Sequence, residues 1–135
     1  MKTAKNIMVC VTQQKTCERL IKRGAEIREE QGGELFVIHV AKEGVNFLGK
    51  SREGDALEYL FEKSKNYGAN LTVVRSQDVL ATLRELTDKN DIGIIVLGES
   101  YENSRDRNMV SNLEKRLPEE VAIQIVPPNK KKYVI

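Results

Sequence analysis

Short apolar runs alternate with longer amphipathic segments along most of the chain. Five of the runs have the length of β-strands: Ile7–Val11, Leu35–Val40, Leu71–Val74, Ile92–Gly98 and Val121–Val126. Most are apolar at nearly every position, which is typical of strands buried on both faces of a sheet. The pattern therefore predicts five strands in a mostly parallel sheet, with helices packed on both faces.

The four segments between these strands repeat apolar residues at helical spacing, so that each helix has one apolar face. The residues expected on these faces are Cys17, Leu20, Ile21, Gly24 and Ile27 in the first, Leu57, Leu60, Phe61 and Ser64 in the second, Val79, Leu80, Leu83 and Leu86 in the third, and Val110, Leu113 and Leu117 in the fourth.

Residues that typically begin or end helices support these boundaries. Glycines at Gln31–Gly33 and Tyr67–Asn70 follow the first two helices, where a left-handed residue commonly ends a helix. Ser76 precedes the third helix, and Ser111 to Glu114 is a capping-box pattern for the fourth. Pro118 is expected to stop that helix.

In open sheets of this kind, ligands bind beyond the carboxyl ends of the strands, where the strand order reverses. That rule nominates the loops after Val11, Val40, Val74 and Gly98. The long connection Ala41–Gly54 is expected at the same edge. We expect a single domain over residues 1–128, followed by a short basic tail, 129–135.

Composition narrows the classes of partner. The chain has 135 residues with 22 basic and 20 acidic side chains, a formal net charge of +2. This balance argues against nucleic acid or an anionic membrane as the main partner. No apolar run approaches the ~20 residues of a membrane span and no secretion signal is visible, so we expect a cytoplasmic protein. Two cysteines, Cys10 and Cys17, and one histidine are too few for a zinc site, so no metal is expected.

The loop after the first strand is the first candidate for ligand contact. It lacks the GxGxxG and GxxxxGK[ST] patterns of dinucleotide and P-loop sites. It offers polar groups leading into a helix N-terminus, which favours anions. The candidate residues here are Val11, Thr12, Gln13, Gln14 and Thr16. Alternatively, Thr16 only caps the helix and the glutamines are solvated.

His39 and Val40 close the second strand and form the second candidate group. His39 could act as a general base, but the sequence supplies no evident nucleophile for it to activate. The alternative is a histidine hydrogen-bonded to a backbone carbonyl. We assign no catalytic residue, and whether the protein is an enzyme is left open.

Gly98 begins the third candidate group, in the loop after the fourth strand. The loop continues through Ser100 toward Ser111 and Asn112 at the start of the fourth helix. Gly98 is its only glycine, and Glu99, Glu102 and Asp106 add negative charge, partly offset by Arg105 and Arg107. The loop therefore lacks the usual anion-binding surface of a glycine-rich phosphate loop.

Taken together, "NIMVCVTQQKTCERLIKRGAEI", "GGELFVIHV" and "IGIIVLGES" resemble the universal stress protein family. The resemblance implies a Rossmann-like, adenine-nucleotide alpha-hydrolase-like fold, with an open five-stranded sheet in the order 3-2-1-4-5. It also implies a homodimer paired through the last strand, whose candidate interface residues are Val121, Ile123, Ile125 and Val126.

Members of the family that bind ATP carry an aspartate after the first strand and a GxxGxxxxxxxxxG[ST] loop after the fourth. Thr12 stands in place of that aspartate, Tyr101 in place of the second glycine, and Ser111-Asn112 in place of the final G[ST]. Two of the three glycines are therefore missing, which predicts that no tight ATP site is formed.

The first third of the chain is similar to the universal-stress-type domain of potassium-responsive sensor kinases. We expect a regulatory protein of the stress or signalling response that acts by binding. The alternative is an adenine-nucleotide sensor for ATP, AMP or cyclic di-AMP. For the last of these, the resemblance adds Phe36 to Thr12, Gln13, Gln14 and His39. A third reading is an interaction module that uses residues 99–107 or Lys130–Lys132.

Overall fold

The computed structural model describes residues 5–11, 14–42, 49–98 and 111–126. Its elements follow the predicted alternation: β1 (Asn6–Cys10), α1 (Gln14–Gln31), β2 (Leu35–Lys42), α2 (Gly49–Asn66), β3 (Asn70–Ser76), α3 (Val79–Lys89), β4 (Ile92–Gly98) and β5 (Ala122–Val126). A helical turn over residues 111–116 precedes β5.

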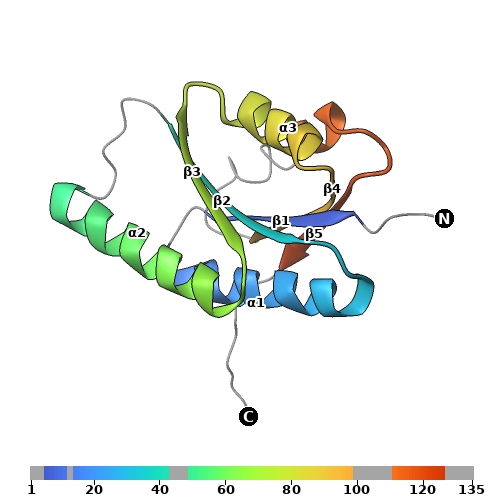
Figure 1. Ribbon diagram of the computed structural model, residues 1–135. Helices are drawn as coiled ribbons and strands as arrows, with labels where there is room; N and C mark the ends of the chain where they lie inside the picture. The colour runs from blue at the N-terminus through green and yellow to red at the C-terminus, as the bar shows by residue number, and fades with distance from the viewer. Residues whose placement is uncertain (1–4, 12–13, 43–48, 99–110, 127–135) are drawn as a thin grey trace, which may run out of the picture.

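The strands form one sheet in the order β3-β2-β1-β4-β5, and every neighbouring pair is parallel. The predicted strand order and fold class are therefore confirmed. In Figure 1, α1 and α2 lie on one side of the sheet, and α3 and the 111–116 turn lie on the other. No helix in the described part of the chain is long and apolar enough to cross a membrane.

Alternate residues of β1 point into two different cores, which explains why the strand is apolar throughout. Ile7, Val9 and Val11 belong to a core shared with α1 and α2, which we call the α1-side core. Met8 and Cys10 belong to a core shared with α3 and the 111–116 turn, which we call the α3-side core.

Gly24 allows α1 to lie close against the sheet. A Cβ atom at this position would be 2.5 Å from Val9 Cγ2 and 2.8 Å from Leu35 Cδ1, closer than real carbon contacts. Helix and strands can approach to this distance only because glycine has no side chain. This close packing places the first half of α1 over the end of β4.

The observed ends of the helices and strands agree with those predicted from the capping and terminating residues. Gly32, Gly33 and Gly68 have φ values of 85°, 96° and 67°, in the left-handed region expected after a helix. The turn at 111–116 ends just before Pro118, as predicted. The predicted bounds of β4 match those observed, and the other strands differ by one or two residues at their ends.

Three details differ from the sequence-based expectation. Helix α2 begins at Gly49, inside the segment expected to be a connection. Phe61 was expected on the apolar face of α2 but is 58% exposed, because the buried stripe of this helix runs through Leu60 and Ser64. Ser111 already lies within the helical turn instead of capping it. Val110 lies outside the described residues.

Candidate functional site

The carboxyl ends of β1 and β4 lie side by side in the middle of the sheet. From β1 the chain continues into α1 on one face, and the turn that follows β4 along the chain packs on the other face (Figure 1). Strand order reverses here, because β2 and β3 extend to one side of β1 and β4 and β5 to the other. Ligands of open α/β sheets bind at this kind of junction.

His39 is held against the end of β1. Its Nδ1–H donates a hydrogen bond to the carbonyl oxygen of Val11 at 2.9 Å, and the Val11 N–H donates to Ile38 O, also at 2.9 Å. The histidine is only 9% exposed. The structural alternative for His39 is thus confirmed: a backbone carbonyl orients the ring at the edge of the sheet.

Gly98 closes β4 directly beneath α1. A Cβ atom built on Gly98 would lie 3.3 Å from Leu20 Cδ1 and 3.7 Å from Arg19 Nη2. Helix α1 therefore passes over the carboxyl end of β4 at side-chain contact distance. The guanidinium group of Arg19 is placed next to the point where the chain leaves the strand.

Arg19 was not among the residues that sequence reasoning selected. Its Nε atom is buried and has no hydrogen-bond partner among the described residues. Arg23, one turn later on the same helix, contrasts with it: the Arg23 Nε–H donates to Gln124 Oε1, and Nη1 donates to Glu26 Oε1 at 3.1 Å. No sequence signal sets Arg19 apart, since Arg23 borders the same apolar face of α1 four residues later.

The remaining candidate residues are placed as follows. Gln14 and Thr16 lie in the first turn of α1. Val40 is partly buried against the α3-side core, while Ser111 and Asn112 are exposed at the start of the 111–116 turn. Thr12, Gln13, Ser100 and Tyr101 lie outside the described residues, as do the 99–107 loop and the lysine tail. The structure brings Val11 and His39 into contact, and places Gly98 beside Arg19.

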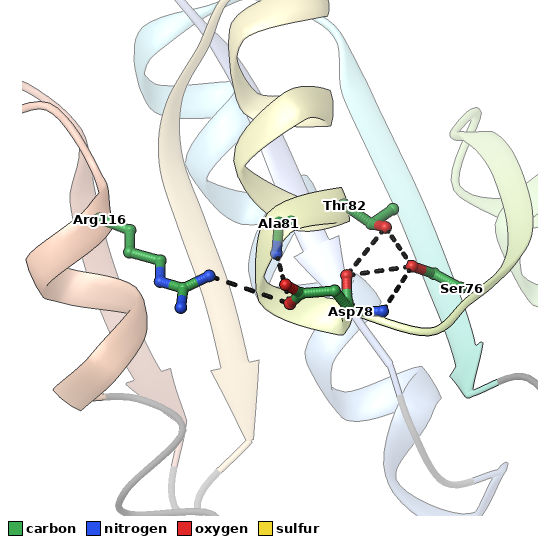
Figure 2. A network of polar contacts seen from close by, with 5 residues as sticks. All are labelled: Ser76, Asp78, Ala81, Thr82 and Arg116. Atoms are coloured by element: carbon green, nitrogen blue, oxygen red, sulfur yellow. Dashed lines mark hydrogen bonds and ion pairs between the residues drawn. The ribbon is translucent and has the colours of Figure 1, made fainter.

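A network of polar contacts joins the end of β3 to the start of α3 (Figure 2). Asp78 caps α3 by accepting a hydrogen bond from the Ala81 N–H at 3.1 Å. Ser76 Oγ accepts bonds from the Asp78 N–H at 3.0 Å and from Thr82 Oγ1 at 2.6 Å. Arg116 Nη1 approaches Asp78 Oδ1 at 3.9 Å. The ion pair links the 111–116 turn to α3. Because the polar groups of this network hydrogen-bond or pair with one another, we interpret the network as structural.

Neither a reactive thiol nor a metal-binding group of side chains is found among the described residues. Burial raises the pKa of the Cys10 thiol to about 12, so at neutral pH it is a protonated core residue. The described residues contain no group of three histidine, cysteine or acidic side chains that could hold a metal ion.

The last strand lies at one edge of the sheet. Of its four candidate interface residues, Val121 and Ile123 pack partly against the α3-side core and Val126 against the α1-side core. Ile125 is 37% exposed. The opposite edge strand, β3, has its own exposed apolar side chain, Val73, at 45%.

Comparisons with known proteins agree on the fold. No protein-family model and no curated protein matches the chain by sequence. Among solved structures, a universal stress protein in complex with cAMP matches with a TM-score of 0.66 and 15% identity, covering 93% of this chain and 98% of that one. The universal stress protein from Archaeoglobus fulgidus in complex with dAMP gives a TM-score of 0.62 and 13% identity, with coverage of 93% and 98%.

The same architecture also occurs within a larger enzyme. A class III photolyase from Agrobacterium tumefaciens matches with a TM-score of 0.68 and 18% identity over 94% of this chain, but this chain covers only 26% of the photolyase. Fold alone does not determine function, so the residues at the sheet edge must carry that argument. What these likenesses establish is that the chain has the Rossmann-like α/β fold of universal stress proteins.

Proposed function

We propose that this chain is a universal-stress-type regulatory protein that binds an adenine mononucleotide at the carboxyl ends of β1 and β4. The observation that carries the proposal is the junction of these two strands, where Gly98 ends β4 beside α1 and His39 is fixed against Val11. Two proteins of the same fold have been solved in complex with cAMP and with dAMP.

The ligand that suits this edge carries one phosphate group. A triphosphate needs several backbone N–H donors, which glycine-rich loops provide through close approach and positive φ. No glycine follows Gly98, the last residue of β4, before residue 111, and three acidic residues lie in that stretch of the sequence. A mononucleotide needs fewer phosphate contacts, so the expected absence of a tight ATP site is compatible with nucleotide binding.

A thermal-shift panel tests the proposal directly. AMP, cAMP, ATP and cyclic di-AMP are added in turn to the purified protein, each with and without magnesium. A ligand present at 100 times its dissociation constant stabilises the native state by roughly 2.7 kcal/mol, which shifts the melting temperature by several degrees. We expect a shift with AMP or cAMP that does not need magnesium. A shift with ATP alone, or no shift with any nucleotide, would contradict the proposal.

We also propose that β5 pairs with β5 of a second copy. Support comes from the place of β5 at an edge of the sheet and from the exposure of Ile125 there, since a free apolar edge invites pairing with another strand. Analytical ultracentrifugation should find a dimer that Ile125→Lys disrupts and Val73→Lys, on the opposite edge strand, leaves intact. If the two variants behave alike, β5 is not the interface.

A further inference from the structure

Arg19 has a buried donor that lacks a hydrogen-bond acceptor among the described residues. Its Nε–H is buried, and no group in the described part of the chain accepts a hydrogen bond from it. An arginine cannot shed its charge by deprotonation, so this donor remains part of a cation. A buried donor without an acceptor is unfavourable, and such atoms in native proteins call for an explanation.

Neighbouring carboxylates on α1 do not neutralise this charge. Glu18, the preceding residue, pairs with Lys63 Nζ at 3.6 Å, and Glu26 pairs with Arg23 at 3.1 Å. Both acidic groups are thus matched with other cations. The positive charge of Arg19 is left for something outside the described protein groups.

The position of Arg19 relates it to the proposed site. Its Nη2 atom lies 3.7 Å from where a Cβ of Gly98 would be, so the guanidinium group is at the carboxyl end of β4. Arg19 also lies about one and a half turns from the first residue of α1, whose N-terminus carries the positive end of the helix dipole. The guanidinium charge favours an anion at the carboxyl end of β4, and the helix N-terminus adds positive potential on the same helix.

We propose that Arg19 binds the phosphate group of the mononucleotide, an inference that rests on the proposed function and identifies its anion-binding residue. The guanidinium fork presents parallel N–H donors that match two oxygens of one phosphate. A cation supplied by α1 compensates for the glycines missing from the loop after β4. It also limits the site to a single phosphate, because one fork satisfies one such group.

Adenosine and AMP separate this inference from the proposed function. Isothermal titration calorimetry measures both ligands with the wild-type protein, with Arg19→Met and with Arg23→Met as the matched control one turn away. Methionine keeps the length and apolar packing of the arginine stem. We expect Arg19→Met to bind AMP about tenfold to a hundredfold more weakly than wild type, the range for a hydrogen bond to a charged group, and to bind adenosine unchanged. Arg23→Met should bind AMP like wild type.

The outcomes are distinguishable. If wild type and Arg19→Met bind AMP equally, the role of Arg19 is overturned while the proposed function stands. If neither ligand binds the wild-type protein, the proposed function fails and this inference fails with it. An equal loss of AMP affinity in Arg19→Met and Arg23→Met would also overturn the inference, because it would reflect the general charge of α1. Thermal melts of the free variants confirm folding, and Arg19→Met should melt no lower than wild type.

Discussion

The α3-side core and the α1-side core are built from the same kinds of aliphatic residues, but they differ in how their polar groups are paired. On the α3 side, the buried Thr87 Oγ1 donates to Leu83 O at 2.7 Å, and Ser76, Asp78 and Thr82 satisfy one another. On the α1 side, Ser64 Oγ and Arg19 Nε are buried without a partner among the described residues.

This difference distinguishes the α3 side, which stabilises the fold, from the α1 side, where we place the ligand site. The paired polar groups of the α3 side are accounted for by the fold itself, whereas a buried group without a partner calls for an explanation. The two unpaired atoms on the other face are not equivalent, however. Ser64 is a neutral hydroxyl at 1% exposure within the core, whereas Arg19 is a cation at the edge where ligands of this fold class bind.

The largest expected effect concerns the α3-side core. Leu113 is fully buried in the helical segment whose described residues are 111–116. Leu113→Ala should lower the free energy of unfolding by about 2–5 kcal/mol, the range for truncating a buried leucine. Urea denaturation measures this loss. The exposed neighbour serves as control: Glu114→Ala should stay within about 0.5 kcal/mol of wild type. Similar small losses in both variants would show that the turn does not complete this core.

Alkaline pH should lower the free energy of unfolding, because Cys10 is buried in the α3-side core. Burial raises the pKa of this thiol from 9.0 to about 12, so the unfolded chain releases the proton before the folded chain does. Stability from this group is complete below pH 9 and falls as pH rises toward 12, by up to about 1.4 kcal/mol per pH unit. Between about pH 8 and about pH 10.5, the free energy of unfolding measured by urea denaturation should therefore fall more steeply with pH for wild type than for Cys10→Val. Parallel pH profiles would contradict the burial of the thiol.

Removal of the cap in Figure 2 should have a smaller effect. Asp78→Ala leaves the Ala81 N–H without its acceptor and should cost about 1 kcal/mol of stability. Arg116→Ala should cost less than about 0.5 kcal/mol, because this ion pair is exposed and long. Thermal unfolding of the two variants compares the cap with the pair. If Arg116→Ala proved the more damaging, the network would depend on the ion pair instead.

The smallest effect should differ in sign between the faces. Ser64→Ala removes an unpaired buried hydroxyl from the α1-side core and should stabilise the protein by up to about 1 kcal/mol. Ser76→Ala removes a paired hydroxyl on the α3 side and should destabilise it. Chemical denaturation of both serine variants gives the comparison. A loss of stability in Ser64→Ala would mean that its hydroxyl has a favourable contact after all.

Sequence reasoning recovered the sheet because strands buried on both faces leave an unbroken apolar signal, as in Ile92–Gly98. It placed the start of α2 too late because the segment from Gly49 to Gly54 is polar and contains two glycines, which have low helix propensity. It proposed a backbone carbonyl as the partner of His39 but could not say which one, because only the register of β1 against β2 shows that Val11 O lies within reach.

Arg19 could not be identified from the sequence for a physical reason. An arginine beside an apolar helix face usually extends its charged end into water along that face. Whether its Nε is buried, and whether an acceptor lies nearby, depends on which strand end passes beneath the helix. Here that strand end is Gly98, far away in the sequence. The strand order alone does not give this contact, because it depends on how closely α1 packs over Gly98.

The most direct test of the central claim is a nuclear magnetic resonance titration that follows the Nε–H signal of Arg19 together with the backbone amides. Adenosine and AMP are added separately to the nitrogen-labelled protein. We predict that AMP shifts the Arg19 Nε–H and the Gly98 amide, that adenosine leaves the Arg19 signal in place, and that Arg23 responds to neither. Shifts centred on the β3 edge, or an Arg19 signal that does not move with AMP, would contradict the account.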